Sequence, residues 1–447
     1  MIYITGLKNP RGTTWLFSSL TKDLNKSGYV GYVWSGQAVL GFGTAGLESL
    51  GKYMGRCTRS FSRVRMSLCG RRGFFVAIIY ILTFALVLPV LCHKLGFSTY
   101  FAKPKEPYKL LEIQNDERTK HARENLETLK QRTKPLSPKQ SKQIEFLIVV
   151  LTAFRAANTH YLLQVTARLL PQVRDDGGRS IITILNSDPK SGLNEDAHYL
   201  SSFITLTNSS APLTSNLRSR EKEDYVVGLE TVLQYNSTYV LMIEDDALPS
   251  ENLLKDLRFV LRHKMPWKFL KTRRDWAFLK LYYPEKWQGF GWPELPELIL
   301  VGFLGGCFGA WIELKLETRL RFKKQFIICA FIVWSTYFVL VVYTVGRAHL
   351  IELRKLSAVL YSVVKAHGCC TPGVLYQRSH ALELAKFLKS VNCNEAYPMD
   401  VAIDDFAKNR SLERYVVIPN MVSHIGVHSS LSNSVKHFAE FYLMFKP

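Results

Sequence analysis

Three consecutive acids, Glu244, Asp245 and Asp246 (the acidic triplet), follow the apolar residues 239–243 and precede a turn-like Ala-Leu-Pro at 247–249. An apolar strand that ends in carboxylates can hold a divalent cation against a diphosphate, because hard cations prefer carboxylate oxygens. Acidic residues at a strand end also often belong to a solvated loop that binds no ligand. Carboxylates this close repel one another unless they are exposed or neutralised, so we expect Glu244 and Asp246 to bind a metal. Asp245 would help to orient the metal and the ribose.

A histidine near the end of the chain forms a second candidate group. His424 comes just after the strand-like residues 415–418 and just before Gly426, Ser429 and Ser430. Glycine and hydroxyl residues let a phosphate approach the backbone closely. A single histidine is more often structural than a ligand, but this one ends a strand as the acidic triplet does. We therefore expect His424 to contact the metal or the diphosphate.

Both groups belong to a predicted alternation of strands and helices. Residues 146–151 and 181–185 have the continuous apolar character of buried strands, and residues 161–170 and 224–235 have helical spacing. This alternation predicts a doubly wound α/β sheet with its ligand at the carboxyl ends of the strands. The candidate nucleotide contacts are the polar residues expected there: Thr152, Arg155, Asn186, Asp188, Lys222 and Asp224.

Three apolar segments have the length and composition of membrane spans. Residues 73–92 carry no charge, and as a helix they would measure about 30 Å, the thickness of a bilayer's hydrocarbon core. Residues 298–316 and 325–346 are two further spans that form a hairpin. Four glycines between 302 and 309 would let the two hairpin helices approach closely. A buried hairpin in a soluble core is the alternative, but it leaves the basic connection between the helices unexplained.

Charge predicts the orientation of these spans. The net charge is +21, and the first 72 residues hold 11 Lys and Arg against 2 acids. By the positive-inside rule, residues 1–72 form a cytoplasmic basic tail and the chain then enters the lumen. The basic hairpin connection is also expected in the cytoplasm. The basic excess therefore indicates membrane topology and lipid contact, and we expect no nucleic acid partner.

The remaining segments complete the predicted organisation. Residues 93–145 are charged and helix-prone, which is typical of a luminal stem. Residues 146–297 and 347–447 are then the two halves of one luminal domain, separated by the hairpin at 298–346.

Cysteines and sequons also fall in the predicted lumen. Cys369, Cys370 and Cys393 clearly face this oxidising compartment. Because three is an odd number, one disulfide from Cys393 to either Cys370 or Cys369, with one free thiol, is the simplest account. The spacing is wrong for a zinc site. The predicted N-glycosylation sites are Asn208, Asn236 and Asn409.

Several segments together resemble a known family, the Golgi GPI-anchor N-acetylgalactosamine transferases. These segments are residues 239–249, 279–285, 354–364, 369–372 and 424–431. The order of the motifs and the position of the hairpin match this family together. Residues 424–431 are similar as well to the N-acetylglucosaminyltransferases IV that branch N-glycans, which share the Glu-Asp-Asp form.

The resemblance implies a GT-A type glycosyltransferase, a hexosyltransferase, split by a transmembrane hairpin and held in the Golgi membrane with its catalytic domain in the lumen. It implies transfer of GalNAc from UDP-GalNAc to a mannose of the GPI-anchor glycan on GPI-anchored proteins, with inversion and with Mn²⁺ at the acidic triplet. Inversion needs a carboxylate that takes the acceptor hydroxyl's proton, and Asp400 best matches the family's acid. Asp404 and Asp405 are rivals that are more typical of a helix surface.

Other functions stay open at this point. One is an N-acetylglucosaminyltransferase IV-like enzyme acting on N-glycans, because the choice of sugar depends on the shape of the pocket. A catalytically silent glycan-binding protein is another, although the acidic triplet and His424 together argue against it. A transporter is disfavoured because the apolar runs 73–92, 298–312 and 325–346 carry no charged residue that would mark a pathway. The sequence does not indicate an oligomeric state.

Overall fold

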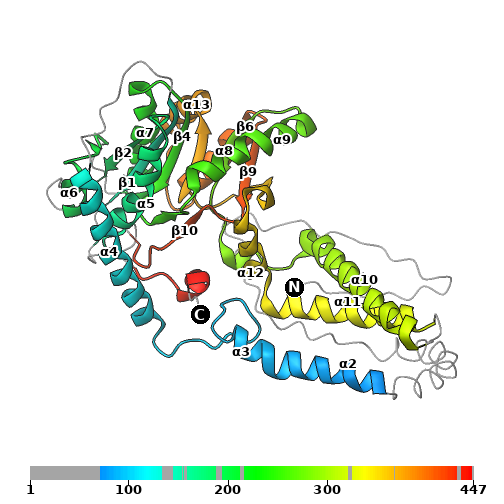
Figure 1. Cartoon of the computed structure of the whole chain (residues 1–447). Coiled ribbons are helices and arrows are strands. Elements are labelled where there is room, and N and C mark those ends of the chain that lie inside the picture. Colours follow the sequence, from blue (N-terminus) through cyan, green and yellow to red (C-terminus); the bar gives the residue numbers. More distant parts are fainter. Residues whose placement is uncertain are drawn as a thin grey trace, which may run out of the picture. The chain divides into compact units, whose positions relative to one another are not determined.

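The computed structural model describes residues 71–132, 144–153, 155, 159–187, 194–211, 216–320, 325–366, 368–429 and 434–444 (Figure 1). The predicted basic tail up to residue 70, the candidate nucleotide contact Asp188 and the end of the hairpin connection lie outside these residues.

The domain is built on an eight-stranded mixed sheet of order β3-β2-β1-β4-β8-β6-β9-β7. Its strands are β1 Ile144–Thr152, β2 Ser180–Asn186, β3 Thr205–Asn208, β4 Ser237–Glu244, β6 Trp276–Lys280, β7 Ser362–Lys365, β8 Gly373–Gln377 and β9 Glu413–Ile418. A separate antiparallel pair joins β5 (Ala247–Pro249) to β10 (Val422–His424).

The sheet is only partly the doubly wound sheet that the sequence predicts. β3, β2, β1 and β4 are parallel, as expected from the alternation of strands and helices. β8, however, runs antiparallel to both of its neighbours, β4 and β6, and β7 runs antiparallel to β9. The strands of the first half can be identified from short apolar stretches of the sequence. The order and direction of the later strands instead depend on pairing between segments that are distant in the sequence.

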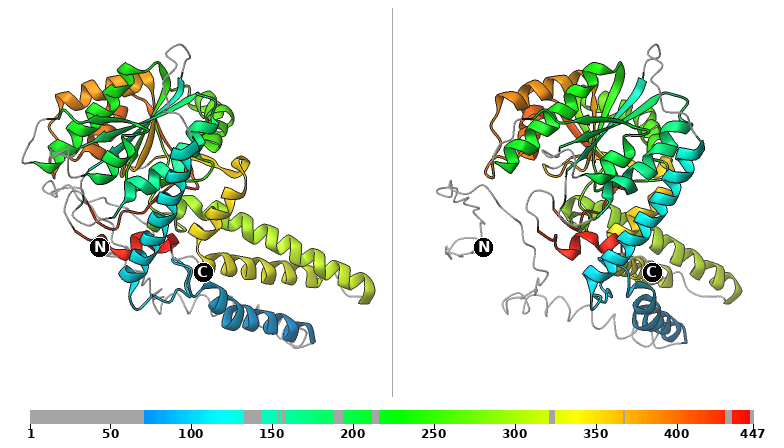
Figure 2. Two further views of the ribbon diagram at one scale, coloured as in Figure 1. Left: turned by 60° about the vertical axis from the view of Figure 1, so that its left-hand side comes forward. Right: turned by 90° about the vertical axis from the view of Figure 1, so that its left-hand side faces the viewer.

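Helices cover both faces of the sheet, which explains why its central strands are apolar on both sides (Figure 2). One face packs on α5 (Tyr161–Asp175) and α8 (Leu253–His263). The other packs on α7 (Leu217–Glu230), α13 (Arg378–Ser390) and α14 (Met399–Asn409). The remaining helices of this part are α6 Glu195–Leu200, α9 Met265–Thr272 and the 3₁₀ turns η2 Thr231–Gln234, η3 Glu285–Trp287 and η4 Trp292–Glu294.

The predicted helix at 224–235 begins seven residues earlier than expected. Asn216 caps α7 by accepting hydrogen bonds from the backbone amides of Arg218 and Ser219, and this cap sets the start of the helix at Leu217. The expected end is replaced by the 3₁₀ turn η2.

The two sequence halves on either side of the hairpin interleave in one sheet. β4, from the first half, pairs with β8 from the second, and β6, again from the first half, lies between β8 and β9. Neither half could therefore complete the sheet alone. The chain therefore leaves this sheet after β6 and returns to it at β7.

Three helical segments are long and apolar enough to cross a membrane: Gly73–Cys92, Trp292–Lys315 and Ile327–Val345. The first comprises α2 (Arg71–Ile81), the π-helical turn η1 (Leu82–Val87) and α3 (Leu88–Cys92). The hairpin comprises α10 (Leu295–Leu320) and α11 (Gln325–Val345). A Cβ at Gly305 would lie 2.4 Å from the Phe338 ring, and one at Gly309 would lie 2.1 Å from the Trp334 ring. The small residues therefore allow the close helix approach that the sequence predicts.

The predicted stem contains a long helix, α4 (Pro107–Arg132), that packs against the domain. Ala122 and Leu126 of α4 join the core around α5, and Arg118 Nε donates a hydrogen bond to Gln164 Oε1 at 2.9 Å. Its first turns contact the last described helix, η7 (Phe438–Met444), through Leu111. This segment thus contributes to the domain's structure as well as connecting it to the first apolar helical segment.

Candidate functional site

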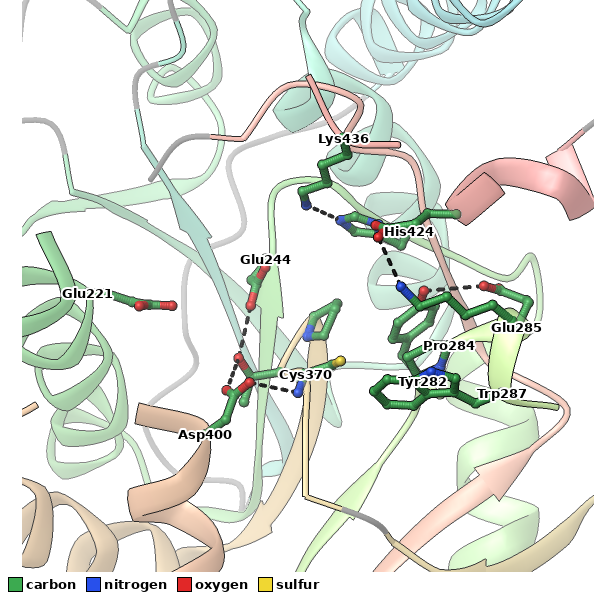
Figure 3. A pocket seen from close by; sticks show the side chains of 14 residues that line it. Glu221, Glu244, Tyr282, Pro284, Glu285, Trp287, Cys370, Asp400, His424 and Lys436 are labelled. Carbon is green, nitrogen blue, oxygen red and sulfur yellow. Dashed lines mark hydrogen bonds and ion pairs between the residues drawn. The ribbon is translucent and has the colours of Figure 1, made fainter. Parts of the chain in front are cut away.

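A cavity of about 230 Å³ lies at the carboxyl end of β4, on the side of the sheet where the acidic triplet ends the strand (Figure 3). Five carboxylates line it, from Glu221, Glu244, Glu285, Asp400 and Glu440. Four nitrogen-bearing side chains also line it: His424 and Lys436, which lie away from Asp400, and Lys286 and Trp287. The cavity thus draws its polar groups from both halves of the sequence.

Asp246 lies behind His424 and Lys436 of this cavity, 2% exposed, among three nitrogen-bearing side chains. Its Oδ2 is 3.4 Å from His424 Nε2, 3.2 Å from Arg155 Nη2 and 3.9 Å from Lys436 Nζ. Its other oxygen, Oδ1, is buried without a hydrogen-bond partner among the described residues. The Asp246 carboxylate therefore has positive or nitrogen-bearing neighbours at Oδ2 and, in the part of the chain that the structure describes, no hydrogen-bond donor at Oδ1.

The ring of His424 is held in place by packing and by the short β10 strand. His424 pairs with Ala247 in the β5–β10 ladder, directly after the acidic triplet. Its ring lies between Tyr282, at 5.9 Å, and Phe441, at 6.0 Å between ring centroids. Nε2 lies 2.8 Å from Lys436 Nζ. Because an ammonium can only donate, Nε2 accepts and has its lone pair toward the site.

Arg155 and Thr152, at the end of β1, fix the middle acid of the triplet. Arg155 Nη2 is 2.5 Å from Asp245 Oδ1, and Thr152 Oγ1 donates to Asp245 Oδ2 at 2.8 Å. A second nitrogen of Arg155 donates to the carbonyl of His428 at 2.6 Å. Arg155 thus ties the acidic triplet to the segment after His424. These contacts give Arg155, Thr152 and Asp245 a positioning role in this structure.

The charges around the triplet separate the pKa values of its outer members. Burial alone would raise the pKa of Asp246, but the charges of Arg155 and Lys436 hold it well below its usual range. Burial and then repulsion by Asp246 raise the pKa of Glu244 to about 8. Asp246 is therefore the carboxylate that stays ionised at neutral pH.

Asp400 enters the cavity from the first turn of α14, as the sequence-based resemblance implies. Its Oδ2 accepts a hydrogen bond from the backbone amide of Cys370 at 2.8 Å. The Thr371 hydroxyl is 3.1 Å from Glu244 Oε1 and 3.5 Å from Asp400 Oδ1, so it lies between the two carboxylates. Asp400 is thus oriented by the segment after residue 368 and faces the open part of the cavity.

The two rivals of Asp400 have structural partners. Asp404 is buried and its Oδ2 lies 2.6 Å from Arg414 Nη1, on the neighbouring strand β9. Asp405 pairs with Lys408 at 3.1 Å on the same helix and accepts a hydrogen bond from Tyr397. Neither of them lines the cavity.

The site residues fit a divalent cation at Asp246 and His424. The orphaned Oδ1 of Asp246 is an anionic acceptor in need of a partner, and Nε2 of His424 offers a lone pair nearby. Among the described residues, no three His, Cys, Asp or Glu side chains are grouped so as to hold a metal. A cation here would therefore take its remaining ligands from a bound diphosphate and water. Lys436 Nζ is an additional positive charge at the same place.

The other predicted nucleotide contacts are not brought to this cavity. Asn186 donates from Nδ2 to Asn208 Oδ1 at 3.1 Å, and Asp224 accepts from the Ser209 hydroxyl at 2.5 Å, at the β2–β3 edge. Lys222 as a nucleotide contact stays a prediction; in this structure its buried Nζ donates to the carbonyl of Val391 at 3.1 Å. These hydrogen bonds between protein groups stabilise the packing of α7 against the edge of the sheet.

The structure contradicts the predicted disulfide. Cys369, Cys370 and Cys393 are all free thiols. Cys393 is completely buried in the core beneath α13 and α14, whereas Cys370 lines the cavity beside Cys369. A hydrogen bond with Cys369 and burial together raise the pKa of the Cys370 thiol. Counting luminal cysteines could not reveal that these thiols occupy different environments.

Three aromatic residues before the hairpin, Trp287, Phe290 and Trp292, lie in different environments. Trp287 lines the cavity and is 49% exposed, so it can contact a sugar. Phe290 instead stacks on Tyr343 of α11, with ring centroids 6.4 Å apart. Trp292 begins η4 and is almost fully exposed.

The three predicted glycosylation sites, Asn208, Asn236 and Asn409, are exposed residues, and their modification stays a prediction. Arg347, the first residue of the helix that follows the hairpin, is buried and pairs with Glu297 at 2.9 Å.

Sequence reasoning missed Lys436, Glu221 and Tyr282 as members of the site. Lys436 reaches it because its backbone amide donates to the carbonyl of Val427 and because Phe438 and Phe441 anchor η7 below. No local pattern around Lys436 distinguishes it from a surface lysine. Tyr282 stands inside the segment at 279–285 that carries the family resemblance, so that segment could have indicated it.

Comparisons with known proteins give one family match and two distant structural similarities. Residues 146–423 match the family described as GPI-N-acetylgalactosamine transferase PGAP4. The chain is similar to the mannosyltransferase PcManGT from Pyrobaculum calidifontis in complex with GDP-Man and Mn²⁺, with 13% identity, a TM-score of 0.20, and coverage of 40% of this chain and 47% of that one. It is also similar to the mannosyltransferase Ktr4p from S. cerevisiae, with 10% identity, a TM-score of 0.20, and coverage of 71% of this chain and 81% of that one.

Proposed function

This chain belongs to the GPI-N-acetylgalactosamine transferase PGAP4 family and is a glycosyltransferase, and we propose that it transfers GalNAc from UDP-GalNAc to a mannose of the GPI-anchor glycan, with inversion. The observation that carries this proposal is that His424 and Lys436, which line the cavity, lie against the buried carboxylate of Asp246, while Asp400 lines the same cavity. A nucleotide sugar needs positive charge at its diphosphate, and an acceptor hydroxyl needs a base on the other side of the sugar.

Asp400 is the proposed base. Its carboxylate takes the proton of the acceptor hydroxyl as that oxygen attacks C1 of GalNAc and the bond from C1 to the diphosphate breaks. The Cys370 amide and the Thr371 hydroxyl hold the carboxylate during this step. Glu244, whose pKa is raised, shares the Thr371 hydroxyl and stands between the base and Asp246.

Asp246 and His424 are the proposed ligands of a divalent cation, with Mn²⁺ as the ion that the family resemblance implies. When bound, such an ion would supply positive charge that neutralises the diphosphate leaving group. Lys436 adds a charge that belongs to the protein itself, 2.8 Å from His424 Nε2. Arg155 holds Asp245 and Asp246 so that the ligand carboxylate keeps its orientation.

We further propose that the enzyme resides in the Golgi membrane with this site in the lumen. Three apolar helices of sufficient length support a membrane protein. The sheet that combines both halves supports one compartment for the two of them. A GPI glycan lies close to the bilayer, and an active site held near the membrane by a hairpin suits such an acceptor.

The test is a donor screen with the purified full chain in lipid nanodiscs. UDP-GalNAc, UDP-GlcNAc, UDP-galactose and UDP-glucose are each supplied with a GPI glycan acceptor, with Mn²⁺ or with a chelator. We expect transfer from UDP-GalNAc with Mn²⁺, and loss of transfer in Asp246→Ala with expression and localisation unchanged. An N-glycan acceptor serves as the comparison.

Transfer of GlcNAc to the N-glycan would refute the proposed substrates and favour the alternative drawn from residues 424–431. Full activity with chelator would refute the metal. Full activity of Asp246→Ala would remove that residue from the mechanism while leaving the family assignment in place.

A further inference from the structure

The short helix α9, remote from the cavity, exposes large apolar side chains that the fold does not use. Trp267 is 74% exposed, Phe269 52% and Leu270 66%, whereas Met265 alone of this helix is buried in the core. The preceding helix, α8, already supplies the packing on this face of the sheet through residues such as Leu257 and Val260. The exposed residues of α9 are therefore available to an external partner.

The charges around α9 have a single sign. Residues 262–274 contain six Lys or Arg and no Asp or Glu. Lys268 and Lys271 stand among the apolar residues on α9 itself. A short helix that combines exposed aromatic residues with basic ones is typical of a segment lying in a membrane interface, where the rings enter the headgroup region and the cations stay at its surface.

A second exposed apolar segment adjoins the first. It comprises the 3₁₀ turns η5 (Leu353–Leu356) and η6 (Ala358–Leu360), in which Leu353, Leu356, Val359 and Leu360 are 59%, 83%, 60% and 50% exposed. Lys264 Nζ donates to the carbonyl of Val359 at 2.8 Å, which ties the two segments together. We call these four residues together with Trp267, Phe269 and Leu270 the apolar rim.

The apolar rim is continuous with the hairpin. Only Gly346 and the short helix α12 (Arg347–Glu352) separate the end of α11 from Leu353. Figure 1 shows α9 and α12 on the side of the sheet from which α10 and α11 leave the domain. A membrane crossed by this hairpin would therefore face the apolar rim.

We propose that the apolar rim lies in the interface of the membrane that the hairpin crosses, as an additional attachment of the catalytic domain to lipid. The proposal rests on the hairpin spanning a membrane, and it requires no particular sugar or acceptor. A second copy of the chain fits less well, because a symmetric contact would bring the two basic clusters against each other. The attachment would limit tilting of the domain about the hairpin.

The test uses the full chain reconstituted in vesicles of phosphatidylcholine and phosphatidylserine. The photoreactive residue p-benzoylphenylalanine replaces one side chain at a time, and mass spectrometry identifies what it cross-links after irradiation. Leu270 and Leu356 report on the apolar rim. Phe303, exposed on α10, is the positive control, and Lys386, exposed on α13 on the far part of the domain, is the negative control.

We expect lipid adducts at positions 270, 356 and 303 and none at 386. Absence of lipid adducts at both 270 and 356 would overturn the proposal, whether or not 303 is labelled, as would cross-links from them to a second copy of the chain. A lipid adduct at only one of the two positions would confine the attachment to that segment and refute the rim as a unit. Activity of the labelled proteins, measured separately, bears on the proposed function and leaves this result unaffected.

Discussion

Gly426→Ala tests whether the contact between Asp246 and His424 matters, because it removes neither functional group. A Cβ at Gly426 would lie 1.9 Å from Asp246 Oδ2 and 2.8 Å from Asp246 Cβ. Non-bonded heavy atoms are attracted at separations of about 3.5–4.0 Å. The carboxylate would thus have to move by roughly 1.5 Å, and Arg155, His424 and the Ile425 amide that donates to the Asp246 carbonyl all oppose this movement.

The expected loss of activity exceeds the expected loss of stability. A misplacement of about 1 Å in an active site can cost about 10²-fold in rate. Overpacking a well-packed site costs about 1–3 kcal/mol, which lowers the melting temperature by several degrees and leaves most molecules folded. We therefore expect Gly426→Ala to lose about 10²-fold or more in kcat/KM while it still expresses and melts cooperatively.

The assay measures release of UDP from the donor in the presence of the acceptor. Thermal unfolding is measured on the same preparation of each protein. Gly289→Ala is the matched control, since no atom lies within 4 Å of the Cβ that it adds. It should behave as the parent protein in both measurements. Activity of Gly426→Ala equal to that of Gly289→Ala would show that the placement of Asp246 against His424 is not needed for transfer.

Three further predictions follow from the same site. Asp400→Asn should lower kcat by about 10²–10⁴-fold with little change in the affinity for UDP measured by calorimetry, and an unchanged kcat would exclude it as the base. Lys436→Met should weaken UDP binding by about 10–10²-fold, the value of a charge-assisted hydrogen bond, whereas Lys386→Met, on an exposed part of α13, should not. Burial raises the pKa of Glu285 above its ordinary 4.5, so the folded protein should lose stability as the pH rises from 4.5 through the raised pKa. Glu285→Gln should therefore raise the melting temperature at a pH above this range but not at a pH below it. An equal change in melting temperature at the two pH values would contradict the assignment.

Much of the fold's first half was predictable because its signals are local. The apolar residues 146–151, 181–185 and 239–243 read as buried strands, and the structure has β1, β2 and β4 there with bounds that differ by at most two residues. The glycines of α10 predicted close packing in the hairpin, and their neighbours on α11 confirm it. The acidic triplet and His424 were also visible, because each stands at a strand end in the sequence itself.

The later strands and several site residues were not predictable in this way. β6, β7 and β8 are only four or five residues long, and their place in the sheet depends on partners from β4 and β9. Asn186, Asp224 and Lys222 were expected at the ligand because strand-end polar residues often bind nucleotides. Their side chains are instead paired with protein groups that sequence spacing cannot identify.

The sequence by itself indicated the three apolar helices long enough to cross a membrane, the parallel strands and the metal-binding candidates Glu244, Asp246 and His424. Hydropathy, periodicity and residue type are properties of short stretches of chain. Only the tertiary structure decided that Lys436 approaches His424, that Arg155 supports the acidic triplet and that Cys370 and Cys393 stay apart. These relations join residues that are far apart in the chain or belong to different elements. They form because packing on the sheet and exclusion of water select which polar groups meet, and that selection depends on the whole fold.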